Sequence, residues 1–316
     1  NLNWDYNVNE TTNLSTVLYA SFGRGGGTGN RGSRKRTADG YIDYNAIYDY
    51  NNNVAGGAGG NFTAGGGYIT RSSMNLHNWV GLVSNLEKTL SENLTLNVGF
   101  DFRNYYGEHF RMVENFHGLT SWREEIRLLD QNNDHQTMDG DGRYGGVYKF
   151  VETTRDLSAN PWAALFANVD NEDKIAYAND ERITYGGIFA QLEYQKDDLT
   201  AFFQGSISNQ WHQRFDYYQY ADQDLIDGTS SQGYYTTPLP AGTEDGVDSE
   251  KVSNFGYNLK AGGSYAIDDN HRVYANVGLY SRQPFHDNIF PQFTNQIFPL
   301  TENETIFGLE AGYSYK

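Results

Sequence analysis

The chain has 316 residues, a formal net charge of −17 and a mean hydropathy of −0.68. Its 35 glycines, 25 tyrosines and 18 phenylalanines, against only 6 prolines, favour many strands and turns over helices. The lack of cysteine in this sequence excludes disulfides, thiolate metal sites and cysteine nucleophiles, and the acidic balance argues against general nucleic-acid binding. No run of about 18 apolar residues marks a transmembrane helix. A membrane β-barrel stays possible, because its strands are only about 10 residues long.

The clearest pattern in the sequence is the alternation of apolar and polar residues. From Leu94 to Arg103, every even-numbered residue is apolar and every odd-numbered residue is polar or glycine. Successive side chains of a strand point to opposite faces, so this segment predicts a strand with one apolar face. The same alternation predicts nine strands, at about residues 1–9, 13–24, 74–89, 93–112, 181–196, 198–219, 253–267, 271–283 and 304–316.

Short and long connections alternate strictly between these strands. Tight polar turns are expected at 9–11, 91–93, 196–198 and 268–270, and long segments at about 25–73, 113–180, 220–252 and 284–303. In an up-and-down sheet this alternation puts every short turn at one end and every long loop at the other, as in outer-membrane barrels. The predicted fold is therefore an all-β, antiparallel up-and-down transmembrane β-barrel. This chain would form a partial barrel of about nine strands, with long extracellular loops and short periplasmic turns.

A soluble β-sandwich or surface-attached β-rich binding protein is the main alternative to this fold. The predicted strands are often about 12 to 20 residues long, whereas strands of globular proteins usually have about 5–6. The polar faces hold scattered charges that would point into a wet lumen and pair with one another or with a plug. These charges are Asp101, Arg103, Glu193, Lys260 and Glu310.

Six segments, in order along the chain, resemble TonB-dependent receptors of the SusC-like group. They are 19–29 (YASFGRGGGTG), 70–82 (TRSSMNLHNWVGL), 97–109 (NVGFDFRNYYGEH), 173–194 (DKIAYANDERITYGGIFAQLEY), 280–290 (YSRQPFHDNIF) and 303–315 (NETIFGLEAGYSY). The resemblance spans nearly the whole chain. It implies a barrel of about 22 strands, with an N-terminal plug in the same full-length chain and a contact with TonB. It also allows for a surface lipoprotein partner.

On this interpretation, residues 1–316 are part of one barrel domain in the outer membrane of a Gram-negative bacterium, and the plug lies outside this sequence. The loops would capture a nutrient for energised import, and outer-membrane lipid would surround the strands. No catalytic constellation is present, so an enzyme is not expected. An outer-membrane scaffold or passive pore that binds partner proteins is the alternative role.

Three groups of loop residues are candidate binding sites, and none implies a required cofactor. Segment 130–141 is dense in oxygen ligands, which calcium prefers, although its spacing does not fit an EF-hand. Its candidate calcium ligands are Asp130, Asp134, Asp139 and Asp141. A locally basic run could meet lipopolysaccharide phosphates or another anion, or could simply be a solvated loop. Its members are Arg31, Arg34, Lys35 and Arg36.

Aromatic residues in or near the long loops form the third group. Trp122, Trp162 and Trp211 could stack on a sugar or peptide substrate, although Trp and Tyr also form girdles at the membrane interfaces. The histidines, including His77 and His109, are dispersed in the sequence without a metal-binding motif. They are expected to be structural or exposed.

Overall fold

The computed structural model describes residues 1–53, 61–62, 67–126, 147–155, 160–166, 168–217, 248–291, 295 and 297–316. Nine strands form one large antiparallel sheet, in which each strand pairs with the strand before and after it in the chain. They are β1 (Leu2–Asn9), β2 (Thr12–Gly32), β4 (Tyr68–Ser91), β5 (Leu94–Asn115), β8 (Lys174–Lys196), β9 (Leu199–Asp216), β10 (Val252–Ala266), β11 (His271–Arg282) and β12 (Glu304–Tyr315). The predicted all-β, antiparallel up-and-down arrangement is confirmed.

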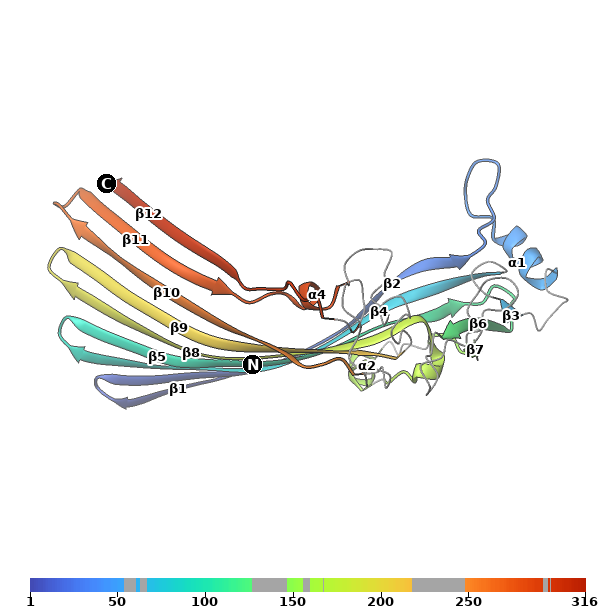
Figure 1. Cartoon of the computed structure of the whole chain (residues 1–316), viewed down its shortest axis with the longest axis horizontal. Helices are drawn as coiled ribbons and strands as arrows, with labels where there is room; N and C mark the ends of the chain where they lie inside the picture. Colours follow the sequence, from blue (N-terminus) through green and yellow to red (C-terminus); the bar gives the residue numbers. More distant parts are fainter. Residues whose placement is uncertain are drawn as a thin grey trace.

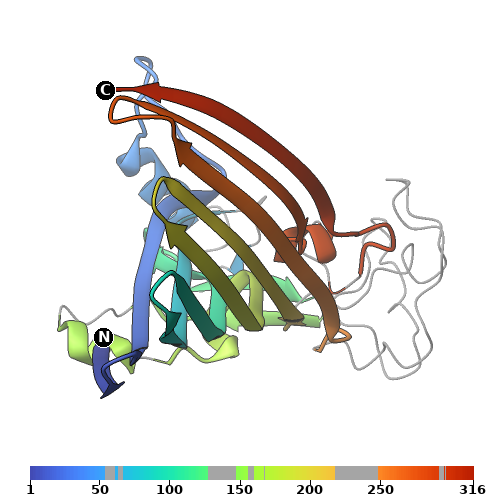
Figure 2. The ribbon, with the colours of Figure 1, turned by 90° about the vertical axis from the view of Figure 1, so that its left-hand side faces the viewer.

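The short turns and the long loops lie at opposite ends of this sheet, as predicted. The turns after β1, β4, β8 and β10 gather at one end, and the loops and helices gather at the other (Figure 1). Viewed from the turn end, the sheet is a curved wall whose two edge strands, β1 and β12, stay apart (Figure 2). The described part of the chain is thus an open, curved sheet.

The strand register sorts the side chains onto a convex outer face and a concave inner face. Val98 lies opposite Ala190, and Ala190 lies opposite Gly205, so neighbouring strands align their apolar residues in rows on the outer face. We call the uncharged outer positions on the short-turn side of the sheet the apolar belt. Lys88, opposite Leu96, and Lys196, opposite Leu199, are charged outer positions at its short-turn edge and are not counted in it. The belt comprises the outer positions of residues 2–8, 14–22, 80–86, 94–104, 184–194, 199–209, 255–265, 273–281 and 305–315.

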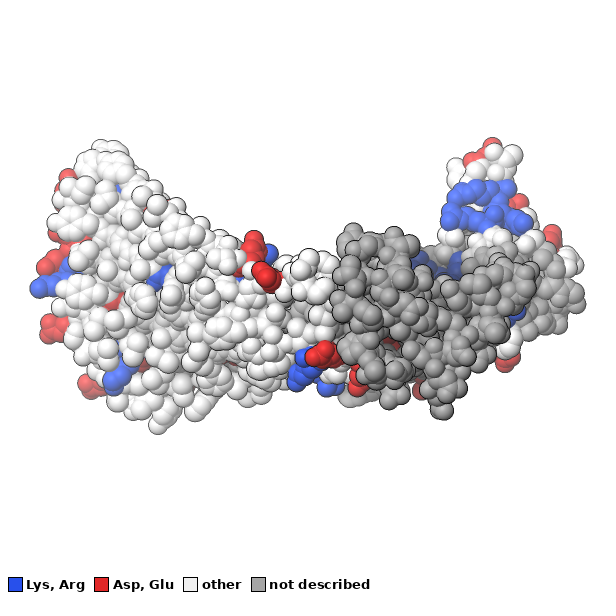
Figure 3. Space-filling model, in the orientation of Figure 1, with Lys and Arg blue, Asp and Glu red and all other residues white. Residues whose placement is uncertain are grey.

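Charged side chains concentrate away from the middle of this wall. In Figure 3 they gather at the short-turn end, on the hairpin that follows β2 and in two small groups beside the grey atoms, and the surface between the short-turn end and these two groups has few of them. Many apolar side chains of the belt are nevertheless open to their surroundings. Phe203, for example, is 56% exposed. A water-soluble sheet would bury such a face, so this belt needs an apolar environment.

Several strands are longer at the loop end than the sequence analysis predicted. Residues 25–32 were expected to enter a loop, but they continue β2 and pair with β4 from Asn75 to Tyr68. Glycine suits this close pairing, because a Cβ on Gly26 would lie 2.5 Å from Sδ of Met74 and 2.8 Å from the backbone oxygen of Ser73. The strand ends at Gly32, whose φ of 94° favours glycine.

The loop end carries further elements that the sequence analysis did not predict. A second sheet has the order β3 (Asn61–Phe62), β6 (Ser121–Ile126) and β7 (Val147–Val151). The helices are α1 (Tyr44–Asn53), α2 (Pro161–Leu165), the 3-10 turn η1 (Asn171–Asp173) and α4 (His286–Ile289). In the described ranges, no helix is both long and apolar enough to cross a membrane.

Two buried clusters stabilise the loop end. One joins the strand tips to β6 and β7 and consists of Ile69, Val113, Leu119, Trp122, Val151 and Ile175. The other lies on the outer face beyond the apolar belt, and we call it the outer cluster. Its members are Met74, Leu76, Phe110, Met112 and Ala178, against which Val169 and Tyr217 pack.

Candidate functional site

The inner face of the wall is polar along its length. The register places Asp101, Arg103, Glu193, Lys260 and Glu310 on this face, where the sequence analysis expected them. Nε of Arg103 lies 3.8 Å from Oδ2 of Asp101, so these two charges offset each other. A concave surface with such side chains suits contact with water, a polar ligand or a plug.

A cluster of histidines around one carboxylate lies on the inner face, beyond the level of the apolar belt. Nε2 of His109 is 3.0 Å from Oε1 of Glu181, and the hydroxyl of Tyr105 donates to the same oxygen at 2.8 Å. Nδ1 of His77 lies 2.7 Å from that hydroxyl. Because the only proton of the Tyr105 hydroxyl goes to Glu181, Nδ1 of His77 is the donor to Tyr105. Three neighbouring strands, β4, β5 and β8, therefore present one connected polar network.

Two more histidines extend the network to β9 and to the connection between β11 and β12. Nε2 of His286, in α4, is 3.4 Å from Oε2 of Glu181, and its Nδ1 is 3.3 Å from Nδ1 of His212. Both rings are buried. We call the six residues the inner-wall cluster: His77, Tyr105, His109, Glu181, His212 and His286.

The connection 283–303 is fastened to the inner face by more than the histidines. Nε2 of Gln283 donates to Oγ of Ser208 at 3.0 Å, and Nη1 of Arg214 donates to Oδ1 of Asn295 at 3.0 Å. Nη1 of Arg214 also donates to Oδ2 of Asp216 at 2.9 Å. The described residues of this connection therefore lie along the wall at the level of α4.

Burial favours the neutral form of His212 and His286, and the surroundings of Glu181 favour its ionised form. Burial and, to a smaller extent, the neighbouring His286 lower the pKa of His212 to about 4. Burial also lowers the pKa of His286, against the attraction of Glu181. Burial alone would raise the pKa of Glu181, but the hydrogen bond from His109 and the electrostatic attraction between Glu181 and His286 outweigh it, and the pKa falls to about 2.

This chemistry suits hydrogen bonding to a polar ligand or partner. Nε2 of His212 is buried and has no hydrogen-bond partner among the described residues, so it is available to a water or ligand atom. Within the same residues, no three His, Asp or Glu side chains converge closely enough to hold a metal ion. The sequence analysis missed this cluster, because its members lie as far as 209 positions apart, from His77 to His286. The sequence offered one signal for their position: each of the strand residues in the cluster alternates with residues that point outward, which places it on the inner face.

The basic run lies where β2 ends and in the hairpin beyond it. Cζ of Arg31 lies 5.9 Å from the ring centre of Trp122, and Nζ of Lys35 lies 3.7 Å from that of Tyr50. Arg36 donates to the backbone oxygen of Gly40, and Arg34 is exposed. Arg34 and Arg36 are thus at the surface, whereas Arg31 and Lys35 stack on aromatic rings.

The three candidate tryptophans do not form one site. Trp122 is fully buried between the strand tips and β7, where its ring packs in the core and is not presented to a ligand. Trp211 lies opposite Thr184 on the outer face, away from the inner wall. Trp162, in α2, is 73% exposed. Asp130, Asp134, Asp139 and Asp141 lie outside the described residues.

No family model and no curated protein matches the sequence. Two solved structures are similar over most of the chain. The copper transporter OprC has a TM-score of 0.49 and 12% identity, over 98% of this chain and 35% of that one. The open form of the ferric-catecholate import receptor Fiu from E. coli K12 has a TM-score of 0.44 and 13% identity, over 89% of this chain and 35% of that one. The chain thus spans about a third of the length of either protein.

Proposed function

We propose that this chain is part of the barrel of a TonB-dependent outer-membrane receptor that imports a nutrient. One observation carries the proposal: a wall of long antiparallel strands has an exposed, uncharged apolar belt on its outer face and a polar inner face. Lipid is the environment that suits the first face, and a wet or plugged lumen suits the second. The belt also argues against the alternative of a soluble binding protein, which would leave this face in water.

The choice among outer-membrane proteins rests on sequence resemblance. The six segments that resemble SusC-like receptors imply a plug and a contact with TonB, both outside this chain. Nutrient import would then proceed by capture in the loops, followed by passage along the inner face when the plug moves. The inner-wall cluster lies on the inner face between the loops and the level of the apolar belt. It would therefore contact the moving ligand or the plug. Calcium binding by segment 130–141 and a surface lipoprotein partner stay predictions.

Two measurements on the full-length protein test this proposal. Fractionation of the producing cells should place the protein in the outer membrane, and it should migrate differently in gel electrophoresis before and after heating, as folded barrels do. Cells that depend on the imported nutrient should lose growth when either this gene or the gene for TonB is deleted.

The two measurements separate the proposed role from its rivals. Recovery in the soluble fraction without heat-dependent migration would contradict the barrel. A heat-modifiable outer-membrane protein whose uptake persists without TonB would instead indicate the passive pore or scaffold.

A further inference from the structure

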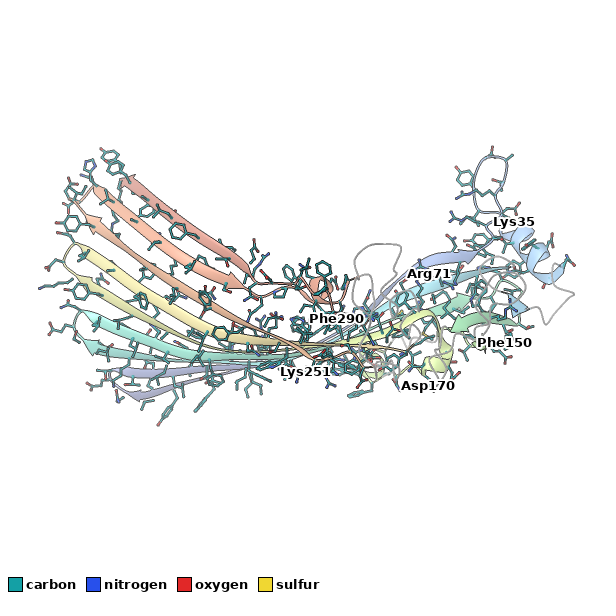
Figure 4. The ribbon with its side chains drawn as sticks, in the orientation of Figure 1. Lys35, Arg71, Phe150, Asp170, Lys251 and Phe290 are labelled. Carbon is teal, nitrogen blue, oxygen red and sulfur yellow. The ribbon has the colours of Figure 1, made fainter. Side chains whose placement is uncertain are left out.

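The segment that contains α2 lies against the outer face of the wall. Val169 packs on the outer cluster, and Nη2 of Arg24 in β2 donates to the backbone oxygen of Leu165 at 3.3 Å. Figure 4 agrees, because Asp170 lies on the convex side of the sheet and Phe290 lies on the concave side. The described residues of this segment, 160–166 and 168–173, therefore lie against the outside of the wall instead of at the mouth of the lumen.

This segment begins where the apolar belt ends. Phe22 is the last belt residue of β2 and is 50% exposed, and Arg24 is the next outer position of the same strand. Two strand residues span about 7 Å. Because Arg24 contacts Leu165, the end of α2 lies about one residue pair beyond the rim of the belt.

Two large aromatic side chains lie at this level, Trp162 in α2 and Phe166 directly after it. Trp162 is 73% exposed and Phe166 is 85% exposed, although apolar rings of this size are usually buried. The backbone N–H of Phe166 bonds to the oxygen of Ala163, three residues earlier, at 3.2 Å, so the turn continues as far as Phe166. Both aromatic side chains therefore belong to one short stretch of chain at this level.

We propose that α2 and the residue that follows it form an interfacial anchor, in which Trp162 and Phe166 insert into the lipid headgroup region at the loop-side rim of the apolar belt. The occupant of this surface is the membrane, because the surface is continuous with the belt. Aromatic rings, Trp above all, favour the boundary between headgroups and acyl chains. The inference rests on the proposed membrane location of the wall, and it assigns Trp162 to lipid instead of a substrate.

Site-directed spin labelling of the full-length protein in phosphatidylcholine vesicles tests this assignment. This chain contains no cysteine, so Trp162→Cys and Phe166→Cys each introduce one labelling site in it. Both side chains are exposed, so their replacement leaves the packing intact. The measured quantity is the rate at which the spin label collides with oxygen, which concentrates in the bilayer, divided by the rate at which it collides with a water-soluble nickel chelate.

Two matched controls set the scale of this ratio. Phe203→Cys lies within the apolar belt, and Tyr41→Cys is 75% exposed on the hairpin at the loop end. Labels at 162 and 166 should give ratios several-fold above that of the label at 41 and below that of the label at 203. Ratios at 162 and 166 equal to that at 41 would overturn the anchor while a high ratio at 203 preserves the proposed function. An aqueous ratio at 203 would instead overturn the membrane location itself.

Discussion

Val98 and Phe110 stand on the same outer row of β5, yet Val98 is 41% exposed and Phe110 is 1% exposed. The half of the wall near the short turns leaves its outer apolar residues uncovered. The half near the loops covers them with residues 160–173 and with Tyr217. The same alternating pattern thus occurs in two environments. Whether an apolar strand face becomes part of a protein core or a contact with lipid depends on whether another segment of the chain packs over it.

The same contrast holds on the inner face. Near the short turns its charges are partly exposed, as at Asp101 and Arg103. Near the loops, α4 and the connection 283–303 bury His212 and His286 and turn a polar wall into a hydrogen-bonded network. The loop-end half therefore behaves as a small globular domain built on the ends of the strands.

Truncation of a side chain in the outer cluster should cause the largest loss of stability. Phe110→Ala leaves a cavity in a buried cluster and should lower the free energy of unfolding by about 3–5 kcal/mol. Met74→Leu, in the same cluster, conserves volume and should cost less than about 1.5 kcal/mol. Urea unfolding in lipid vesicles measures both. An equal, small effect of the two substitutions would show that residues 160–173 do not seal this face.

A charged side chain introduced into the apolar belt should lower the stability somewhat less than Phe110→Ala does. Val98→Lys puts an ammonium group on the lipid side and should lower the free energy of unfolding by roughly 2–4 kcal/mol. Gln191→Lys is a matched control, because its side chain points inward at the same depth and contacts Glu193. A refolding titration in vesicles compares them. If Val98→Lys lost no stability, the lipid-facing assignment of the belt would have to be abandoned.

Lowering the pH should lower the free energy of unfolding, because the buried His212 of the loop-end half resists protonation. Because burial holds the pKa of His212 near 4, below its value of about 6.5 in the unfolded chain, the unfolded state takes up a proton first as pH falls. The contribution of neutral His212 is therefore complete above about pH 6.5 and is lost as pH falls toward about 4. Glu181 adds a second loss only below about pH 4.5, down to its folded pKa of about 2.

The variant His212→Gln isolates the first of these losses. It removes the titrating group, so its urea unfolding midpoint should fall less than that of the wild type between about pH 7 and pH 5. At about pH 8 both chains carry an uncharged side chain at this position, which provides the reference. A variant with the full pH dependence of the wild type would assign the effect to other groups.

The smallest effect is expected at a partly exposed ion pair. Nε and Nη2 of Arg155 lie 2.5 and 2.8 Å from the two carboxylate oxygens of Glu114, and this pair ties the residues after β7 to β5. Solvent screens such a pair, so Arg155→Ala should lower the free energy of unfolding by no more than about 1 kcal/mol. The same urea titration measures it. A loss several times larger would mean that this pair holds the second sheet in place.

The sequence by itself determined the large sheet of nine strands. Alternation of side chains follows from strand geometry, so the nine strands, their up-and-down order and the four short turns could be predicted from local patterns such as residues 94–103. The inward direction of Asp101 and Lys260 followed from the same rule. Prediction failed at the strand ends, because partners distant in sequence extend the pairing of the glycine run after Phe22.

The tertiary structure alone decided what covers each face and which polar residues meet. His77, His109 and His212 lie on three strands whose pairing register sets them near Glu181, and the position of α4 adds His286. The same is true of Trp162, whose position outside the wall depends on the contacts of Leu165 and Val169. Contacts of this kind join residues far apart in the chain, and no local alternation encodes them.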